Sequence, residues 1–400
     1  MILGVRIEFV LFGLTLLGVA LFHQRTLEVA VTGLAAIVLY KLLVTGFDEG
    51  DGAIGLLLHL RHEWVILVNL LCLLVGFALL SRHFEDSRVP AMLPRYLPDD
   101  WTGAFAMLAI VFVLSSFLDN IAAALIGGAM AHTLFRGRVH IGYIAAIVAA
   151  ANAGGSGSVV GDTTTTMMWI AGVSPTGVLH AYVAAAVALV VFGVPAAFLQ
   201  QRHSPIILDA SPGTRIDWPR VLVVAFVLVA AVATNVTVNV RFTAAADHFP
   251  FIGTAVVSAL LLAALLRRPD WRLIPPALRT SAFLLSLVTC ASLMPVETLP
   301  PASWPTAFGL GVVSSFFDNI PLTALALKQA GYDWGVLAYA VGFGGSMVWF
   351  GSSAGVAISN MYPEAKSVGA WVTSGWFVAV AYVAGFFVML LAVGWHPGAM

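Results

Sequence analysis

The chain has 400 residues, of which 60% are hydrophobic and only 10% are charged, and its formal net charge is −1 at pH 7. Soluble domains carry about 25% charged residues, so the composition excludes an ordinary soluble domain and indicates an integral membrane protein. The net charge says nothing about partners, because it averages over loops and lipid-covered helices. Cys72 and Cys290 both lie in apolar runs. They indicate neither a disulfide framework nor a thiolate metal site.

Eight apolar runs are long enough to cross a bilayer, which takes about 20 residues of helix. They cover residues 2–22, 26–46, 63–81, 177–199, 220–240, 249–267, 277–295 and 367–395. The first run is too long for a signal-peptide core and has no Ala-x-Ala cleavage pattern, so we expect it to remain as a spanning helix. Two charged pairs near helix ends, Glu8 with Arg6 and Glu28 with Lys41, are expected to reach the membrane interface.

Two polar motifs occur twice in this apolar background. Residues 115–121 read Ser-Ser-Phe-Leu-Asp-Asn-Ile, and residues 314–320 read Ser-Ser-Phe-Phe-Asp-Asn-Ile, an offset of 199. Each copy is followed by Gly-Gly-Ser-x4-Gly, at 154–161 and again 190 residues later at 344–351. The same two motifs in the same order indicate an internal duplication.

Each motif predicts one interrupted element in each half. The first predicts re-entrant helical hairpins over 101–135 and 305–331, because the apolar stretches beside it are at most one crossing long. The second predicts broken helices over 141–172 and 334–360, since glycine costs about 1 kcal/mol per helix position relative to alanine. The backbone expected at these breaks comprises Asn152, Gly154, Gly155, Gly161, Gly344, Gly345 and Gly351.

The predicted fold class is an all-α polytopic membrane protein with two inverted repeats. Each repeat has three spans, a re-entrant hairpin, a broken helix and a final span. The first repeat covers residues 1–200 and the second 220–400, with a cytoplasmic linker at 201–219. Three spans separate the first repeat from the second hairpin, so the hairpins would enter from opposite faces. Inverted repeats with paired broken helices are typical of secondary transporters that bind at the membrane midplane.

The basic residues predict the orientation of the chain. In the topology above, one side holds 14 of the 19 Lys and Arg residues, and the others are Arg6, Lys41, Arg61, Arg241 and Lys328. Basic loops are retained in the cytoplasm, so that side is cytoplasmic and both termini are extracytoplasmic. We expect the chain in the plasma membrane, which in bacteria is the inner membrane.

Asp119 and Asp318 are the first candidates for a functional site, because the duplication matches them and places both at hairpin tips. A carboxylate at membrane depth is costly and is usually functional. Each Asp-Asn pair could instead only cap the returning helix, a role that both residue types perform well. Asn120 and Asn319 could offer an amide oxygen to a cation or a donor to a carboxylate, so they do not discriminate between substrates.

Asp162 is a third candidate carboxylate, at the end of the first break and just before Thr163. It could cap the following half-helix or act as an auxiliary ionisable group, and its counterpart in the second half is Ser352. Hard monovalent cations prefer such oxygen ligands, whereas the motifs lack the His and Cys typical of transition-metal sites. The candidate cation- and proton-binding residues are Asp119, Asn120, Ser156, Asp162, Thr163, Asp318, Asn319, Ser346 and Ser352, with Na⁺ held by Asp119 and Asp318.

Residues 115–121, 151–170 and 314–324 together resemble the NhaD-type sodium/proton antiporters of the ion transporter superfamily. The resemblance covers roughly residues 100–360. It implies a hairpin-and-broken-helix fold, usually dimeric, with a scaffold part and a mobile transport part. In the carboxylate carriers of the superfamily the tips and breaks carry Ser-Asn-Thr motifs, whereas here aspartate precedes each tip asparagine. Val159-Val160 departs from the apolar-Pro-Ile sequence common in the superfamily.

The leading hypothesis is a secondary antiporter that exchanges Na⁺ or Li⁺ for H⁺ by alternating access. Burial disfavours a charged carboxylate and a nearby cation favours it, so cation and proton would compete for the same groups. The alternative is a Na⁺- or H⁺-coupled carrier of citrate, a dicarboxylate or arsenite, but no Lys or Arg lies in the motifs. A channel would not need matched titratable groups. We expect no enzymatic activity, no cofactor and no nucleic-acid partner; the expected partners are membrane lipid, small inorganic ions and a second copy of the chain.

Overall fold

The structure is a computed structural model that describes residues 6–22, 25–92, 97–206, 215–242 and 248–398. Regular structure in these residues is helical, apart from one isolated bridge between Phe47 and Gly50. Five described helical segments are long and apolar enough to cross a membrane, or six if one bent pair counts as a span. This confirms the predicted class of all-α polytopic membrane protein. The five segments are Thr26–Thr45, Gly52–Asp86, Pro175–His203, Trp218–Asn235 and Trp271–Ser292.

The chain folds into two compact units, and each takes segments from both sequence halves. Unit 1 contains residues 1–83, 218–299 and 324–329. Unit 2 contains residues 84–217, 300–323 and 330–400. The three leading predicted spans of each half thus belong to unit 1. Unit 2 holds the predicted final spans, the broken helices and the hairpins, except for the last part of the second hairpin.

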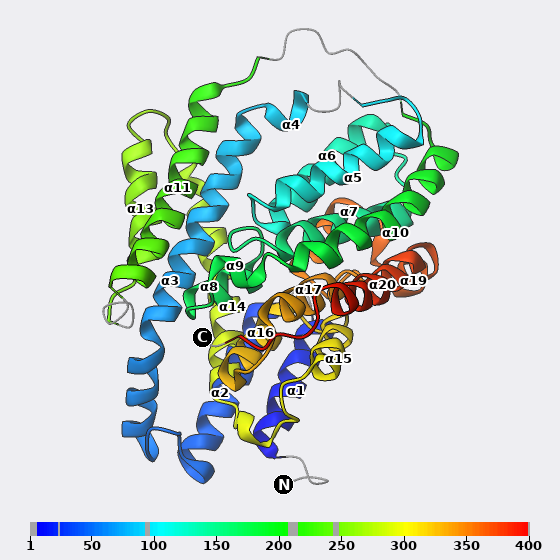
Figure 1. Ribbon diagram of the computed structural model, residues 1–400. Coiled ribbons are helices and arrows are strands. Elements are labelled where there is room, and N and C mark those ends of the chain that lie inside the picture. The colour runs from blue at the N-terminus through cyan, green and yellow to red at the C-terminus, as the bar shows by residue number, and fades with distance from the viewer. Residues whose placement is uncertain (1–5, 23–24, 93–96, 207–214, 243–247, 399–400) are drawn as a thin grey trace. The chain divides into compact units, whose positions relative to one another are not determined.

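Unit 1 is built on the long helix α3 (Gly52–Asp86). The other helices are α1 (Ile7–Leu21), α2 (Thr26–Tyr40) with the π-helical turn Lys41–Thr45, α11 (Trp218–Arg241), α13 (Phe251–Ala263) and α14 (Ile274–Ser292). Figure 1 shows α3, α11 and α13 side by side, and Asn69 of α3 accepts a hydrogen bond from the Gly253 N–H of α13 at 2.8 Å.

Three helices of unit 1 differ in length from the predicted spans. With 35 residues, α3 far exceeds the predicted 63–81. By contrast, α1 has 15 residues and α13 has 13, both short of the about 20 needed for a crossing. Residues 2–5 of the predicted span 2–22 and residues 207–214 of the predicted linker 201–219 lie outside the described residues.

Unit 2 contains both hairpin tips, and the helices begin and end close to the predicted boundaries. The first hairpin is α5 (Trp101–Ser115) and α6 (Asn120–Leu134), which lie side by side in Figure 1. The second is α15 (Trp304–Ser314) and α16 (Asn319–Gln329). In both, the polar motif interrupts an apolar helix at the turn, because Ser, Asp and Asn hydrogen-bond to nearby backbone.

The two broken helices are α7 (Ile141–Ser156) with α8 (Thr163–Ile170), and α17 (Trp334–Gly344) with α18 (Ser353–Met361). The breaks start later than predicted, since Asn152, Gly154 and Gly155 are still helical and Gly344 ends α17. Close packing explains these glycines. A Cβ at Gly154 would lie 2.0 Å from the Phe112 carbonyl oxygen, and a Cβ at Gly344 would lie 2.2 Å from that of Gly311. Gly161, Gly345 and Gly351 do lie in the non-helical breaks.

The predicted final span 367–395 is not one straight helix. It consists of α19 (Val368–Ser374) and α20 (Trp376–Ala392), which meet at Gly375 with a bend of 60°. The bend brings Gly375 close to α7, where an added Cβ would lie 3.0 Å from that of Ala145. Hydropathy measures the apolar length of a run and not its direction, so the sequence does not reveal this bend.

The helix α10 (Ala181–His203) contacts the starts of both broken helices of unit 2, one near each of its own ends. At its C-terminal end, Gln200 Oε1 accepts a hydrogen bond from the backbone N–H of His140, which caps α7. At its N-terminal end, His180 Nε2 lies 2.6 Å from Oδ1 of Asp333, which caps α17. The broken helices therefore start at opposite ends of α10.

Candidate ion-binding site

The tip aspartates of unit 2 each cap a returning helix. Asp119 accepts a hydrogen bond from the Ile121 N–H at 3.2 Å, and Asp318 accepts one from the Ile320 N–H at 3.1 Å. Both residues are half-buried. A carboxylate has two oxygens and about four lone-pair sites, so capping leaves capacity for a further ligand at both tips.

Each tip carboxylate also contacts the first residue of a half-helix. Ser353 donates a hydrogen bond to Asp318 Oδ2 at 2.8 Å, and the Thr163 side chain bonds to Asp119. Thr163 and Ser353 are counterparts under the 190-residue offset. The two halves therefore build the same contact between a hairpin tip and the start of a half-helix.

Asn152 of α7 links the first tip to the break between α17 and α18. Its Oδ1 accepts a hydrogen bond from Asn120 Nδ2 at 3.0 Å. Its Nδ2 lies 2.9 Å from Ser346 Oγ and 3.1 Å from Ser352 Oγ. All four side chains are buried. Segments nearly 200 residues apart in the chain therefore meet in one polar centre of unit 2.

Asp162 lies in the interior of this centre, where its exposure is only 1%. Its Oδ1 accepts a hydrogen bond from the Thr164 N–H at 2.9 Å and so caps α8. The second oxygen, Oδ2, is buried without a hydrogen-bond partner among the described residues. Asp119 and Asp318 lie close enough to Asp162 for their carboxyl groups to interact with it electrostatically. The three predicted carboxylates therefore share one electrostatic environment.

The remaining predicted residues lie in the same part of unit 2. Ser156 donates its hydroxyl to the Ala153 carbonyl at 2.8 Å, which leaves the oxygen lone pairs as its available ligand atoms. Ser352 accepts a hydrogen bond from the Gly355 N–H at 3.2 Å and caps α18. Asn319 is 3% exposed, and its Nδ2 has no partner within the described part of the chain.

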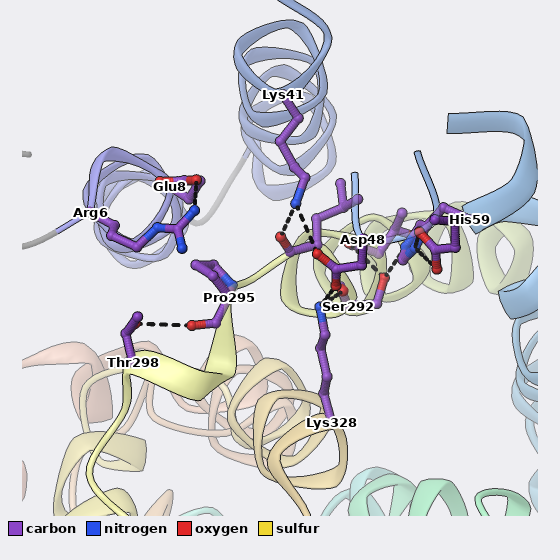
Figure 2. Close-up of polar contacts among 12 residues, drawn as sticks. Arg6, Glu8, Lys41, Asp48, His59, Ser292, Pro295, Thr298 and Lys328 are labelled. Atoms are coloured by element: carbon purple, nitrogen blue, oxygen red, sulfur yellow. Dashed lines mark hydrogen bonds and ion pairs between the residues drawn. The ribbon is translucent and has the colours of Figure 1, made fainter. Parts of the chain in front are cut away.

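A second polar cluster, in unit 1, was not predicted from the sequence (Figure 2). Lys41 was expected at the membrane interface, but it is 4% exposed and donates a hydrogen bond to the Leu293 carbonyl at 3.1 Å. Lys328 donates to the Ser292 carbonyl at 2.7 Å and to Asp48 at 2.9 Å. The carbonyls at a helix C-terminus favour cations, so the end of α14 accounts for the burial of the Lys41 amine and for the position of the partly exposed Lys328 amine.

The Asp48 side chain of this cluster lies between the two lysines in Figure 2. Burial raises the pKa of Asp48, but the hydrogen bond and charge of Lys328 outweigh burial and hold the pKa below its ordinary value. Nearby, His59 contacts Glu49 at 3.0 Å and Ser292 Oγ at 3.0 Å. A lysine inside an apolar run is the one sequence signal that could have revealed the cluster.

Glu8, the other residue expected at the interface, is also buried, at 1% exposure. Its Oε1 accepts a hydrogen bond from Arg6 at 2.9 Å, as Figure 2 shows. The arginine compensates the buried charge, which explains why the carboxylate does not need to reach water. Glu28 is exposed as expected, although it pairs with Arg279 at 3.0 Å and not with Lys41.

These features define an all-helical membrane protein whose polar centre combines two capped hairpin tips with two broken helices. No family model matches the chain. The chain is 29% identical, over 325 residues, to the Arabidopsis thaliana protein named sodium/proton antiporter 1. The match covers 72% of this chain and 53% of that protein, so the chain spans about half the length of this relative.

Proposed function

We propose that the chain is a secondary transporter that exchanges Na⁺ or Li⁺ for H⁺ by alternating access. The observation that carries this proposal is the grouping of Asp119, Asp162 and Asp318 in one polar centre of a membrane protein. The name of the Arabidopsis relative supports the same activity. We also propose the plasma membrane as the location, extracytoplasmic termini and a homodimer, on the basis of the charge distribution and the family resemblance.

The chemistry of the centre suits a small monovalent cation. Carboxylate, amide and hydroxyl oxygens are the ligands that hard cations prefer. A buried carboxylate is disfavoured in its charged form unless a cation lies close, so the centre holds either the cation or protons. A cation that binds from one side of the membrane then displaces the protons, and protons that bind from the other side displace the cation. This competition is the basis of exchange. Asp119 and Asp318 are the shared sites in this proposal, and Asp162 is auxiliary.

An anion carrier is supported less well. Anions bind at the free N–H groups of half-helix N-termini. Here, side chains already accept hydrogen bonds from N–H groups at the N-termini of both α8 and α18. Asp162 accepts from the Thr164 N–H in α8, and Ser352 accepts from the Gly355 N–H in α18. The two motifs of each half also contain no Lys or Arg to attract a carboxylate or oxyanion substrate.

The test is ΔpH-dependent Na⁺ flux in proteoliposomes that contain wild type, Asp119→Asn or Asp318→Asn. Asparagine caps helices about as well as aspartate, so these changes remove the charge and keep the cap. We expect exchange to fall to the level of empty liposomes, with folding stability changed by less than about 1 kcal/mol.

Asp100→Asn is the matched control, because Asp100 also caps a helix of the first hairpin, through the Thr102 N–H, but is exposed. This variant should exchange Na⁺ at the wild-type rate. Wild-type rates in both tip variants would show that the tip aspartates only cap their helices, and the proposal would then lose its basis.

A further inference from the structure

Lys328 attaches the end of the second hairpin to other segments of unit 1. It lies in the last turn of α16, within residues 324–329, which belong to that unit. Its amine donates to the Ser292 carbonyl at 2.7 Å and to Asp48 Oδ2 at 2.9 Å. Ser292 ends α14 and Asp48 lies in the turn before α3. A single side chain therefore joins the end of α16 to two segments that are distant in the sequence.

The end of α14 that receives Lys328 is itself held in place. Lys41 donates to the Leu293 carbonyl at 3.1 Å, one residue after the Ser292 carbonyl to which Lys328 donates. His59 Nε2 lies 3.0 Å from the hydroxyl oxygen of Ser292. Figure 2 shows the side chains of Lys41, His59 and Lys328 pointing toward this helix end. Two further segments, the π-helical turn after α2 and the helix α3, therefore fix the helix end to which α16 is attached.

The first hairpin is attached to a different helix. Its returning helix α6 ends at Leu134, and the next carbonyl, that of Phe135, accepts a hydrogen bond from the Ser204 hydroxyl just after α10 at 3.4 Å. Gln200 of α10 also donates to the Arg138 carbonyl at 3.1 Å. All of these residues belong to unit 2. The two hairpins therefore have different attachments at their far ends, although their tips carry the same motif.

The tip carboxylate of the second hairpin lies at the other end of α16. Asp318 precedes the helix and caps it through the Ile320 N–H at 3.1 Å. The helix runs from Asn319 to Gln329 without interruption; Pro321 lies in its first turn, where proline is tolerated. An α-helix is a hydrogen-bonded unit with a rise of about 1.5 Å per residue. The position of its C-terminal end along the axis therefore also sets the position of its N-terminal end.

We propose that Lys328 is a positioning residue for Asp318, because the attachment of α16 to α14 sets where the tip carboxylate lies. This inference rests on the proposed Na⁺/H⁺ exchange, in which Asp318 is one of the two shared sites. In this role Lys328 does not bind the ion. It acts through α16 and keeps Asp318 where Ser353 donates to its Oδ2 at 2.8 Å. The first tip does not depend on this attachment.

The experiment compares wild type with Lys328→Met, which keeps a long side chain but removes its charge and its donors. Na⁺/H⁺ exchange in proteoliposomes gives the half-saturating Na⁺ concentration and the maximal rate. One net hydrogen bond changes an equilibrium by about twofold to tenfold, so we expect the half-saturating concentration to rise by about that factor in Lys328→Met. The maximal rate should stay close to that of wild type, because the groups that bind the ion are intact.

Deuterium uptake by purified protein without Na⁺ tests the positioning independently of transport. In Lys328→Met the amides of residues 319–323 should take up deuterium faster, because α16 opens more easily when its C-terminal end is released. The amides of residues 120–124 in the first hairpin are the internal comparison and should keep their wild-type rates. A general loss of stability would instead raise deuterium uptake in both hairpins.

Two further variants serve as controls. Lys328→Arg keeps a charged donor and should retain the wild-type Na⁺ half-saturation and the wild-type deuterium uptake of residues 319–323. Arg279→Met removes the cation of another ion pair in unit 1, which joins the first part of α14 to Glu28 at 3.0 Å and is exposed. This variant should match wild type in both measurements, because its ion pair does not involve α16.

The outcomes separate this inference from the proposed function. If wild type shows no ΔpH-coupled Na⁺ flux, the exchange proposal fails, while faster deuterium uptake confined to residues 319–323 still supports the positioning of the second tip. If wild type exchanges and folded Lys328→Met keeps the wild-type Na⁺ half-saturation and uptake, Lys328 does not position Asp318. Faster uptake in both hairpins would overturn the inference as well, since Lys328 would then only stabilise the fold.

A second substitution covers the case in which Lys328→Met does not fold. Lys328→Gln keeps a polar amide but still loses the ion pair with Asp48. The same two measurements apply to it, and we expect the same changes in the same direction. Wild-type values in folded Lys328→Gln would overturn the positioning role equally.

Discussion

Asn152 connects more parts of the polar centre than any other side chain described above. It accepts from Asn120 and lies within hydrogen-bond distance of Ser346 and Ser352. Its side chain therefore links α7 to α6 and to the break before α18. A buried group that loses its partner costs about 1–3 kcal/mol, so Asn152 contributes to stability apart from any role in transport.

We therefore expect Asn152→Ala to lower the free energy of unfolding by about 1–3 kcal/mol. The measurement is chemical unfolding in detergent without Na⁺. Asn360→Ala is the control, because Asn360 is exposed on α18 and should change stability by less than about 0.5 kcal/mol. Equal stabilities of the two variants would contradict the role given to the amide.

At the scale of residues, the sequence predicted the acidic and hydroxyl members of the centre but not its connections. Asp119 and Asp318 could be predicted because a duplicated charge stands out in an apolar background. Asn152 was expected only as part of an unwound backbone, whereas it is helical and acts through its side chain. Its contacts join segments far apart in the chain, and no local pattern encodes such distances.

At the scale of elements, Asp333 stabilises the N-terminal end of α17. This buried carboxylate caps the helix through the Val336 N–H, lies 2.6 Å from His180 Nε2 and accepts from the His396 N–H at 2.8 Å. Burial raises the pKa of Asp333, but these hydrogen bonds outweigh burial and the pKa lies below its ordinary value. The interactions therefore stabilise the charged form and the start of α17.

The lowered pKa predicts how stability depends on pH. A carboxyl group with a lowered pKa in the folded state stabilises the fold above its unfolded pKa, about 3.9, and loses this effect as pH falls through the folded value. We expect Asp333→Asn to cost about 1.5–3 kcal/mol near pH 6, and progressively less as the pH falls below the unfolded pKa and through the lowered folded pKa. Thermal unfolding across this range measures the difference.

Asp99→Asn provides the comparison for that series, because Asp99 is exposed on a loop. Its stability should follow that of wild type at every pH. A constant difference between wild type and Asp333→Asn from neutral to acidic pH would show that the carboxylate charge does not stabilise α17.

The elements that polar residues interrupt were predicted well, and the uniformly apolar ones less so. The bounds of α5, α6, α15 and α16 lie within a few residues of the predicted hairpins, because the interrupting motif marks the turn. The short α13 and the bend at Gly375 were missed. When packing ends or bends a helix inside an apolar run, the hydropathy of the sequence does not change at that point, so the sequence does not reveal the position.

At the scale of the whole molecule, each compact unit contains segments from both halves of the sequence. Unit 1 takes the leading spans of both halves, and unit 2 takes both breaks and both tips. Whether these units act as the scaffold and transport parts that the family resemblance implies stays a prediction. The sequence alone could predict the repeats from matched motifs, but the grouping into units depends on contacts between the repeats.

The orientation of the molecule can be tested at the two ends of α10. The positive-inside rule places the Arg202 end in the cytoplasm and the Ser174 end, just before this span, outside. Both residues are exposed. In a Cys72→Ala/Cys290→Ala background that still exchanges, we expect a membrane-impermeant maleimide to label Ser174→Cys in intact cells.

Under the same conditions Arg202→Cys should be labelled only after the membrane is permeabilised. The two positions lie at opposite ends of one helix, so each serves as the control for the other. The reversed pattern would place both termini in the cytoplasm and would contradict the predicted orientation while leaving the fold unchanged. Labelling of both positions in intact cells would be incompatible with α10 as a membrane-spanning helix. The starts of α7 and α17, which lie at opposite ends of α10, could then not be assigned to opposite sides of the membrane.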